Sequence, residues 1–369
     1  MNIKTITCHN VYNYGASLQA YALMKYLQNL GHNVEIIDYM PKYIRDSLSL
    51  WSIGKRWNKN MIIKFAFYCY VVPMRICNKR GHRKFDAFTN DYLSLTRRYN
   101  SYEELCEYPP EADVYFAGSD QIWNPTINNG LDPAFYLNFI SECKTKASYA
   151  ASFSISDIPV QYQNFIKEKL TKLDFISVRE ESGLRILQKL GFNKGVQVVD
   201  PVFLLEKNDW EKFIYRPKYE QYILVYDQEN NGVIKDLAVF FSQCKKKKIV
   251  AFRDLYPRFY ADYTETNTGP IDFLSLIAHA DIVITNSFHC MAFSIIFEKN
   301  FYVVPRMHQK VNSRMKDLLD FIGCSDRLIA QTDFQYIDSI INYEYVKNRL
   351  LEKKKQSCHY INTVLTLSK

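Results

Sequence analysis

One of the seven histidines follows an expected strand at a position suited to handling phosphate. His289 lies in DIVITNSFHCMAF, residues 281–293, where the pattern predicts a strand ending at Thr285 and then a helix. Ser287 is a good N-cap, which would place His289 in the first helical turn, beside backbone N–H groups without intrahelical partners. An imidazole there could act as a general acid or donate to a phosphate oxygen. Ser287 and Asn286 are candidate substrate contacts beside it, although a lone histidine is more often structural.

A second polar group follows the strand expected at 113–117. The loop GSDQIWNP, residues 118–125, begins with a glycine that allows a sharp turn. A carboxylate, two amides and an indole on one loop could bind a sugar, with the polar groups on its hydroxyls and the ring against its face. An Asx turn beside a core tryptophan explains the same residues equally well. The candidates in this loop are Asp120, Gln121, Trp123 and Asn124.

A third polar segment, HNVYNYGAS at residues 9–17, lies between a strand expected at 3–8 and the first helix. Free N–H groups at the start of that helix would favour an anion or another polar ligand. The segment is neither a Walker loop nor a GxGxxG motif, so nucleotide binding is unsupported, and a structural turn is the simpler interpretation. The candidates here are Asn13, Tyr14 and Gly15.

Three arginines stand near expected strand ends or helix starts. They are Arg179 in SVREES, Arg306 in VPR and Arg314 in VNSR. Each guanidinium could hold an anionic group through two parallel hydrogen bonds. Surface salt bridging is the default explanation for each of them.

The elements that must position these residues alternate between strand and helix. A strand, a helix and a strand occupy residues 3–38, and the rhythm continues to 196–205 and restarts over 222–305. Such alternation predicts parallel sheets in an α/β fold with two Rossmann-like domains facing a cleft. We expect an N-terminal domain at 1–205, a C-terminal domain at 206–336 and a Lys-rich amphipathic helix at 337–369.

Composition sets the class of protein. The chain has 369 residues, a net charge of +8, 47% hydrophobic and 23% charged residues, which indicates an ordinary globular protein of two domains. Nine cysteines occur without a CxxC pair, and the N-terminus lacks a secretory signal, so we expect reduced thiols and a cytoplasmic location. No stretch approaches the ~18 apolar residues of a spanning helix, which predicts a soluble or peripheral protein.

The positive charge is concentrated between residues 42 and 98. This segment holds 13 Lys or Arg against 3 Asp or Glu, interleaved with aromatic residues that include Trp51, Trp57, Phe65 and Tyr70. It could be an ordinary helical insertion packed on the first domain. It could instead be a patch that contacts anionic lipid headgroups, with aromatic rings at the membrane boundary. No nucleic-acid-binding motif accompanies the charge, so nucleic acid is not an expected partner.

Seven segments occur in a set order along the chain: NYGASLQAYAL (13–23), GSDQIWNP (118–125), YAASF (149–153), SVREESG (177–183), VDPVFLL (199–205), TNSFHC (285–290) and NSRMKDLL (312–319). Taken together, they resemble the polysaccharide pyruvyl transferase family over most of the chain. Members of this family move the enolpyruvyl unit of phosphoenolpyruvate onto a sugar as a pyruvate ketal, using a GT-B-like pair of Rossmann domains. The resemblance implies phosphoenolpyruvate as a co-substrate, a sugar acceptor, and no metal or other cofactor.

The resemblance also implies roles for individual residues. His289 corresponds to the family histidine that handles the phosphate and a proton, and Arg179 to an arginine that contacts phosphoenolpyruvate. Asp120 falls in the acceptor-side loop, where we expect it to deprotonate the acceptor hydroxyl. Many members carry a DRxHG-like segment that here is NSFHC, so Ser287 and Cys290 replace an arginine and a glycine. The missing anion contact must then come from another residue, and the candidates are Arg306 and Arg314.

The expected product is a ketal on a sugar, such as a galactoside, of a lipid-linked or polymeric glycan in capsule or exopolysaccharide synthesis. A polyprenyl-diphosphate carrier would explain the basic, aromatic segment, because the enzyme would then work at the inner face of the cell membrane. Two alternatives remain open from the sequence. One is a nucleotide-sugar-dependent GT-B glycosyltransferase, and the other is a catalytically silent scaffold in polysaccharide assembly.

Overall fold

The first half of the chain forms a five-stranded parallel sheet. The computed structural model describes residues 1–53, 58, 60–252, 258–307, 313–330, 334 and 340–368. The strand order is β3-β2-β1-β4-β5, so the chain starts in the middle of the sheet and builds outward on both sides. A short two-stranded sheet continues beyond β5. The strands are β1 (Asn2–Ile6), β2 (Asn33–Tyr39), β3 (Leu95–Tyr99), β4 (Val114–Ala117), β5 (Thr145–Ser148), β6 (Ser177–Val178) and β7 (Val196–Gln197).

The second half repeats this architecture. Its sheet has the order β10-β9-β8-β11-β12, again entirely parallel and again with the first strand at the centre. Every residue of β11 is buried, as expected for a central strand covered by helices on both faces. The strands are β8 (Tyr222–Tyr226), β9 (Lys248–Phe252), β10 (Tyr263–Glu265), β11 (Ile282–Thr285) and β12 (Asn300–Val303).

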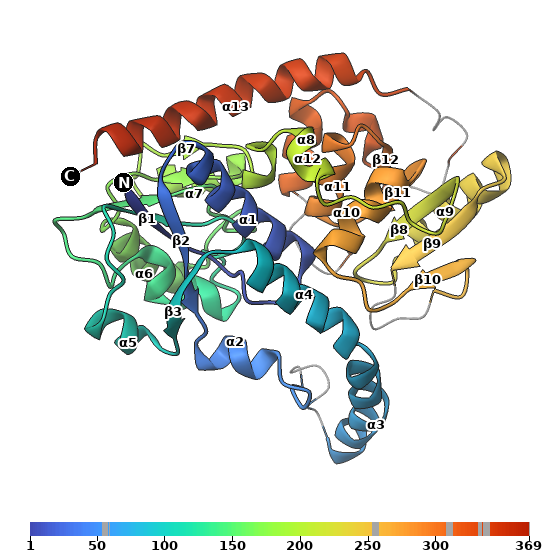
Figure 1. The fold of residues 1–369 in the computed structure, drawn as a ribbon, viewed down its shortest axis with the longest axis horizontal. Coiled ribbons are helices and arrows are strands. Elements are labelled where there is room, and N and C mark those ends of the chain that lie inside the picture. The colour runs from blue at the N-terminus through green and yellow to red at the C-terminus, as the bar shows by residue number, and fades with distance from the viewer. Residues whose placement is uncertain are drawn as a thin grey trace.

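Helices cover the faces of both sheets (Figure 1). In the first half these are α1 (Tyr14–Asn29), α5 (Tyr102–Glu107), α6 (Val160–Leu170) and α7 (Glu181–Lys189). In the second half they are α8 (Lys207–Glu211), α9 (Gly232–Lys245), α10 (Pro270–His279), α11 (Phe288–Ile296) and α12 (Ser313–Phe321). The predicted α/β fold with two Rossmann-like halves is therefore confirmed.

Some expected elements differ from those observed. The strand expected at 196–205 is only two residues long, because Asp200 and Pro201 begin a 3₁₀ turn at Pro201–Phe203. The first helix begins at Tyr14, so Tyr14 and Gly15 belong to its first turn and not to the preceding loop. Two edge strands, β3 and β10, were not expected; both carry polar, partly exposed residues that lack an apolar run.

The basic segment at 42–98 is mostly helical. It contains α2 (Lys42–Ser47), α3 (Met61–Cys77) and α4 (Lys79–Tyr92), and α3 projects away from both sheets (Figure 1). Trp57 lies outside the described residues. No single helix in the described ranges has the length and apolar character to cross a membrane, although α3 and α4 meet that test jointly with a 50° bend between them.

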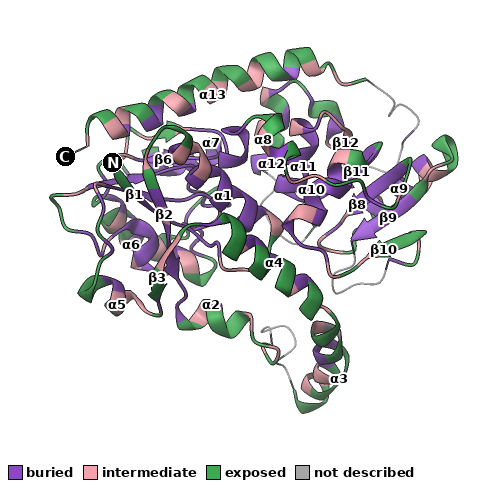
Figure 2. Ribbon diagram, viewed as in Figure 1, coloured by how far each residue is buried: buried purple, intermediate pink, exposed green. Residues whose placement is uncertain are grey.

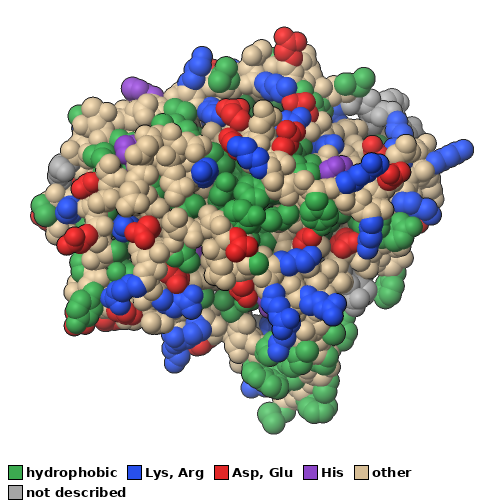
Figure 3. Space-filling model, in the orientation of Figure 1, with side chains coloured by type: hydrophobic (Ala, Val, Ile, Leu, Met, Phe, Trp, Pro, Cys, Tyr) green, Lys and Arg blue, Asp and Glu red, His purple; other side chains and the backbone are tan. Residues whose placement is uncertain are grey.

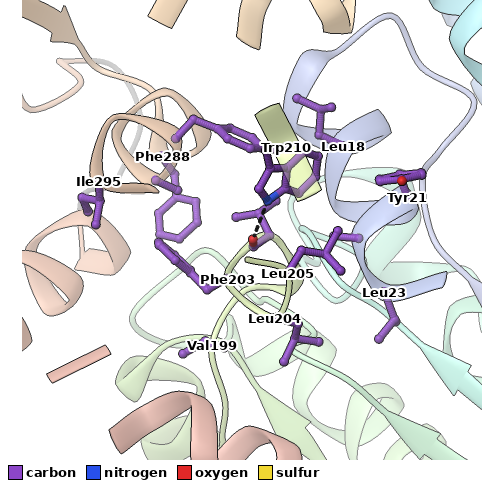
Figure 4. Packing of buried hydrophobic residues seen from close by; sticks show 14 of the residues in the cluster. Leu18, Tyr21, Leu23, Val199, Phe203, Leu204, Leu205, Trp210, Phe288 and Ile295 are labelled. Atoms are coloured by element: carbon purple, nitrogen blue, oxygen red, sulfur yellow. Dashed lines mark hydrogen bonds between the residues drawn. The ribbon is translucent and has the colours of Figure 1, made fainter. Parts of the chain in front are cut away.

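A continuous apolar core joins the two halves. Figure 2 shows the buried residues gathered on the strands and the inner helices, and one cluster of them includes side chains from α1, α10 and α11. Trp210 is fully buried at the centre of this seam and donates its indole N–H to the carbonyl of Val202 at 3.2 Å. Figure 4 shows Trp210 between Leu18 and Tyr21 of α1 and Phe288 of α11. The two halves are therefore joined by packed side chains at this seam.

The last helix returns from the second half to the first. Helix α13 (Tyr343–Thr366) runs along one side of the whole molecule and ends near the N-terminus (Figure 1). The hydroxyl of Tyr360 donates to the carbonyl of Ser148, and the backbone N–H of Val199 donates to the hydroxyl of Ser357. The expected start of this helix near residue 337 lies outside the described residues.

Candidate active site

His289 is held at the start of α11, where it contacts the first helix of the chain. Ser287 is the N-cap, and its hydroxyl accepts a hydrogen bond from the backbone N–H of Cys290, which confirms the predicted helix start. The imidazole packs directly on Gly15, so closely that a Cβ atom at Gly15 would lie 2.0 Å from Nδ1 of His289. This contact requires glycine at position 15. Two of the polar segments predicted from the sequence therefore meet at one point.

Asp200 joins the two predicted catalytic residues through a buried chain of charges. Its Oδ2 lies 2.6 Å from Nη1 of Arg179 and 3.5 Å from Nε2 of His289. Nη2 of Arg179 in turn lies 3.6 Å from Oδ1 of Asp120. These residues follow four different strands, β7, β6, β11 and β4. Since the carboxyl ends of parallel strands meet at one edge, the fold brings them together from distant parts of the sequence.

Burial and neighbouring charges act in opposite directions on the pKa values in this network. Burial alone would raise the pKa of Asp200, but the facing His289 and Arg179 hold the pKa of that carboxyl well below its usual range. Burial would likewise lower the pKa of Arg179, but Asp200 and Asp120 raise it. Asp200 therefore stays ionised near neutral pH. It can orient His289, but it is too weak a base to carry a proton itself.

Arg314 places a second buried guanidinium at the same site. Among the described residues it has far fewer hydrogen-bond and ion-pair partners than Arg179. Its side chain makes one long hydrogen bond, 3.4 Å from Nη1 to the hydroxyl of Ser154, and Nε has no hydrogen-bond partner among the described residues. Burial and the nearby Arg179 lower the pKa of Arg314 to about 10. Arg179 and Arg314 both lie over the ring of Phe288, at 4.8 and 5.5 Å from its centroid. Two buried guanidiniums this close together favour the binding of an anion.

A small cavity of 30 Å³ lies beside these two arginines, bounded also by Asp200 and Phe288. This volume is about what one water molecule occupies. A larger anion could enter only if the surrounding side chains moved apart. Asp120 keeps 19% of its side chain exposed and Arg306 keeps 15%, so the network retains some contact with solvent.

The loop that follows β4 has mainly structural roles apart from Asp120. Asp120 adopts a left-handed conformation with φ 68°, and its carbonyl accepts hydrogen bonds from the N–H groups of Ile122 and Ser152, which fixes the carboxylate in place. Trp123 is fully buried, stacks on Tyr136 and donates to a backbone carbonyl. It therefore offers no ring face to a sugar, contrary to the expectation, because the core takes up the whole indole.

Two amides of the predicted sugar loop lie beside Asp120. Asn124 is buried and its Oδ1 accepts from both the N–H and the hydroxyl of Thr126, as in the alternative Asx-turn interpretation. Its Nδ2 donates to Gln121, whose side chain stays partly exposed. Gln121 is thus better placed than Asn124 to meet a ligand.

Asn286 and Arg306 are both engaged within the protein. The amide of Asn286 accepts from the N–H of Gln228 and donates to Asp227, so it ties the end of β11 to the end of β8 and has a structural role in place of the expected substrate contact. Arg306 follows β12 and donates from Nε to Glu229 at 3.1 Å. Its charge nevertheless reaches Arg314 and lowers the pKa of Arg314 further.

The N-terminal candidates Asn13 and Tyr14 line a polar cavity of 220 Å³ between the two halves. Asn13 caps α1 through a hydrogen bond from Ala16. Tyr14 stacks on Phe273 at 4.6 Å and its hydroxyl lies 2.6 Å from that of Thr268. The cavity also has walls from α4 and from the ends of β8 and β9: Gly81, His82, Phe85, Tyr226, Gln228 and Phe252. Tyr14, which lines the cavity, is followed in the sequence by Gly15, on which His289 packs.

Sequence reasoning missed two central residues of the site, Asp200 and Glu180. Glu180 is buried and its Oε1 accepts from the hydroxyl of Ser152 and from two backbone N–H groups, which fixes the turn that carries Ser154. Its Oε2 lies 3.7 Å from Nε of Arg179. Both acids lie inside segments that carry the family resemblance, SVREES and VDPVFLL. The available signal for Asp200 was a carboxylate inside an otherwise apolar run, the strand predicted at 196–205.

Comparisons with known proteins agree with this architecture. The sequence pattern of the polysaccharide pyruvyl transferase family matches residues 13–307. The chain belongs to this family. The match contains Asp120, Arg179 and His289 and ends before Arg314. As a polysaccharide pyruvyl transferase, the protein is an enzyme of the transferase class.

Of three similar solved structures, the first below has a TM-score above 0.5 and supports the two-domain fold. UDP-GlcNAc 2-epimerase from Methanocaldococcus jannaschii is 12% identical, with 99% of each chain covered and a TM-score of 0.51. The corresponding Neisseria meningitidis enzyme is 11% identical, with 96% of this chain and 100% of that chain covered and a TM-score of 0.46. The glycosyltransferase SnogD from Streptomyces nogalater is 11% identical, covering 100% and 98% with a TM-score of 0.41. No curated protein sequence matches this pyruvyl transferase significantly.

The part of this pyruvyl transferase that the structure describes contains no group of three or more His, Cys, Asp or Glu residues arranged to hold a metal ion. What the described site offers is an imidazole oriented by a buried carboxylate, a partly exposed carboxylate at Asp120, and a guanidinium at Arg314 without an ion pair. These groups can transfer protons and hold an anion.

Proposed function

We propose that the enzyme transfers the enolpyruvyl unit of phosphoenolpyruvate to a sugar and releases inorganic phosphate. The observation that carries this proposal is Arg314, a buried cation with one long hydrogen bond among the described residues, lying over the ring of Phe288, which precedes His289. A charged donor with a phosphate and a carboxylate would supply the negative charge that Arg314 lacks. The proposal needs no metal or organic cofactor. Because the adjoining cavity holds only 30 Å³, donor binding requires Arg314 and its neighbours to move apart.

The chemistry requires three proton movements. Protonation of C3 makes C2 of the enol electrophilic, and a sugar hydroxyl then adds to C2 while its proton passes to a base. A second hydroxyl of the same sugar forms the other C–O bond as the C2–O bond to phosphate breaks, and its proton passes to the leaving phosphate. We assign His289 to the proton donor or the phosphate partner and Asp120 to the base. Asp200 keeps the imidazole oriented throughout, and Arg314 holds the charge of the leaving phosphate.

We assign the acceptor to the polar cavity of 220 Å³ between α1 and the ends of β8 and β9. Its hydroxyl and amide groups suit sugar hydroxyls, and Tyr14 in its wall precedes Gly15, on which His289 packs. A galactoside on a polyprenyl-diphosphate carrier is the acceptor we propose, with the basic segment at 42–98 resting on the anionic inner face of the membrane.

The test is phosphate release from phosphoenolpyruvate by the purified protein, across galactosides and mannosides on lipid-like aglycones. We expect release to depend on one acceptor and the product to gain the mass of the ketal. His289→Asn should lower kcat by roughly 10²–10⁴-fold, as for loss of a general acid, whereas His32→Asn in the turn between α1 and β2 should not. No release with any acceptor, together with thermal stabilisation by a nucleotide sugar, would overturn the proposal in favour of glycosyl transfer.

A further inference from the structure

Helix α3 carries its apolar residues on the outside. Met61 and Ile62 are each 80% exposed and Phe65 is 72% exposed. The other exposed described positions on this helix are Ala66, Cys69, Tyr70, Pro73, Ile76 and Cys77. At 100° per residue these positions cover one continuous half of the helix surface, and none of them is charged. A helix on the surface of a soluble protein shows the opposite pattern.

The charged residues of α3 lie on the other side of the helix. Lys64 and Arg75 are only partly exposed, and Arg75 donates from Nη1 to the carbonyls of Leu50 and Ser52, at 2.8 and 2.7 Å. Phe67 and Val71 are buried on the same side. These contacts fix the rotation of α3 about its axis, so its apolar half is held outward and cannot turn inward to form a core.

Basic residues adjoin this apolar surface. Lys79, Arg80 and Arg83 are exposed on α4, directly after the bend at the end of α3. Figure 3 shows hydrophobic side chains gathered on the projecting tip, with Lys and Arg side chains beside them. Apolar residues that enter the acyl region and cations that stay at the headgroups are the two components of an interfacial membrane helix. The charge complements an anionic surface.

Helix α4 connects this surface to the polar cavity. Gly81, His82 and Phe85 line the cavity, and His82 stacks on Tyr12 at 3.8 Å. Lys84 forms an ion pair with Asp272 at 2.8 Å, which ties α4 to the second half. The position of α3 is therefore fixed relative to the cavity by one short, anchored helix.

We infer that α3 lies in the plane of an anionic membrane, with Ile62 and Phe65 among the acyl chains and the basic residues of α4 at the headgroups. A sugar carried on a lipid then emerges beside α4 and meets the polar cavity. The inference that the protein binds lipid depends only on α3 and α4. The inference that an acceptor is delivered there rests on the proposed function.

The experiment is cosedimentation of the full chain with phosphatidylcholine vesicles, with and without phosphatidylglycerol. Wild type should bind the anionic vesicles. Ile62→Ser/Phe65→Ser changes no charge and should weaken binding by at least about tenfold, because the inserted apolar area is lost. Arg80→Gln/Arg83→Gln should weaken it by about fivefold for each residue and lose the preference for phosphatidylglycerol. Val160→Ser, which alters a residue 83% exposed at the start of α6, is the matched control and should bind like wild type.

Two results would overturn the inference. One is wild-type protein that stays in the supernatant with anionic vesicles. The other is a dimer in sedimentation equilibrium that Ile62→Ser/Phe65→Ser dissociates, because that face would then be covered by a second copy. Phosphate release with a water-soluble acceptor should be equal in wild type and Ile62→Ser/Phe65→Ser. If vesicles bind but no acceptor supports release, the proposed function fails while the membrane helix stands.

Discussion

At the scale of single residues, the site combines three carboxylates with two guanidiniums, and the two cations are compensated unequally. Arg179 has Asp200 at 2.6 Å and two further carboxylates within 3.7 Å. Among the described residues, the side chain of Arg314 has one hydrogen-bond partner, the hydroxyl of Ser154 at 3.4 Å. The lowering of its pKa from 12.5 to about 10 corresponds to roughly 3 kcal/mol of electrostatic cost in the unliganded protein. We therefore expect anion binding to stabilise the fold through Arg314.

This imbalance gives a prediction for Arg314→Met. The variant removes a poorly compensated buried charge, so its melting temperature without ligand should equal or exceed that of wild type. Phosphoenolpyruvate should raise the melting temperature of wild type, and the rise should disappear in Arg314→Met. Differential scanning calorimetry measures both effects. An unchanged response of the variant to phosphoenolpyruvate would show that the donor binds elsewhere.

Asp200 predicts how stability depends on pH. Its folded-state pKa is depressed, so its stabilising contribution is complete above the unfolded value of about 3.9 and is lost as pH falls through the lower folded value. Asp200→Asn leaves Arg179 buried with less compensation and should cost about 3–5 kcal/mol at neutral pH. Wild type should also lose more stability than the variant on going from about pH 5 to about pH 3. Urea unfolding at the two pH values checks this; parallel losses in both proteins would contradict it.

Local residue patterns predicted His289 but not its partner. The N-cap Ser287 and the position of His289 in the first turn follow from neighbours in the sequence, and both are confirmed. Asp200 contacts His289 only because β7 and β11 end at the same edge of the molecule. Nothing within a few residues of either one encodes that contact. For Trp123 the local pattern was misleading. The neighbouring residues resemble a sugar-binding loop, but the indole is buried in the core, where it stacks on Tyr136.

At the scale of elements, the first turn of α1 packs directly against His289 of α11. The close approach leaves no space for a side chain at Gly15. Sequence alternation alone predicted β1, α1 and β2 closely, because each has a clear apolar period and ends at a glycine or a polar turn. It could not predict that α1 and α11 touch, since that contact is set by how the two sheets pack.

We predict that Gly15→Ala reduces activity far more than stability. The added methyl group would displace the imidazole from Asp200, and misplacement by about 1 Å costs on the order of 10²-fold in rate. Gly232→Ala, near the start of α9, is the control because no atom lies within 4 Å of its added Cβ. Phosphate release and thermal unfolding of both variants provide the measurement. Equal activity in the two would mean that the position of His289 is not critical.

At the scale of the whole molecule, α13 contributes to the core of both halves. Its residues Val346, Tyr360, Ile361 and Val364 belong to the same apolar cluster as α1 and α10. The sequence predicted a long Lys-rich helix at this end of the chain but gave no sign of what it covers. The packed seam at Trp210 could not be predicted from the sequence either, because two α/β halves separated by an open cleft would show the same pattern of strands and helices.

Ile361→Ala should therefore destabilise the entire molecule. Its side chain is fully buried, so the expected loss is about 2–5 kcal/mol in the free energy of unfolding. Leu351→Ala on the same helix removes as many carbon atoms from a residue that is 49% exposed, and should cost much less. Chemical denaturation followed by circular dichroism compares them. Similar losses in the two variants would contradict the structural role assigned to this part of α13.

The return of α13 has a consequence for biosynthesis. Tyr360 meets Ser148 across 212 residues of chain, so the ribosome must make almost the whole protein before the first half receives its last packing layer. Long-range contacts of this kind slow folding. During that interval the nascent first half exposes the apolar surface that α13 later covers, which makes it a natural client for chaperones that hold emerging chains.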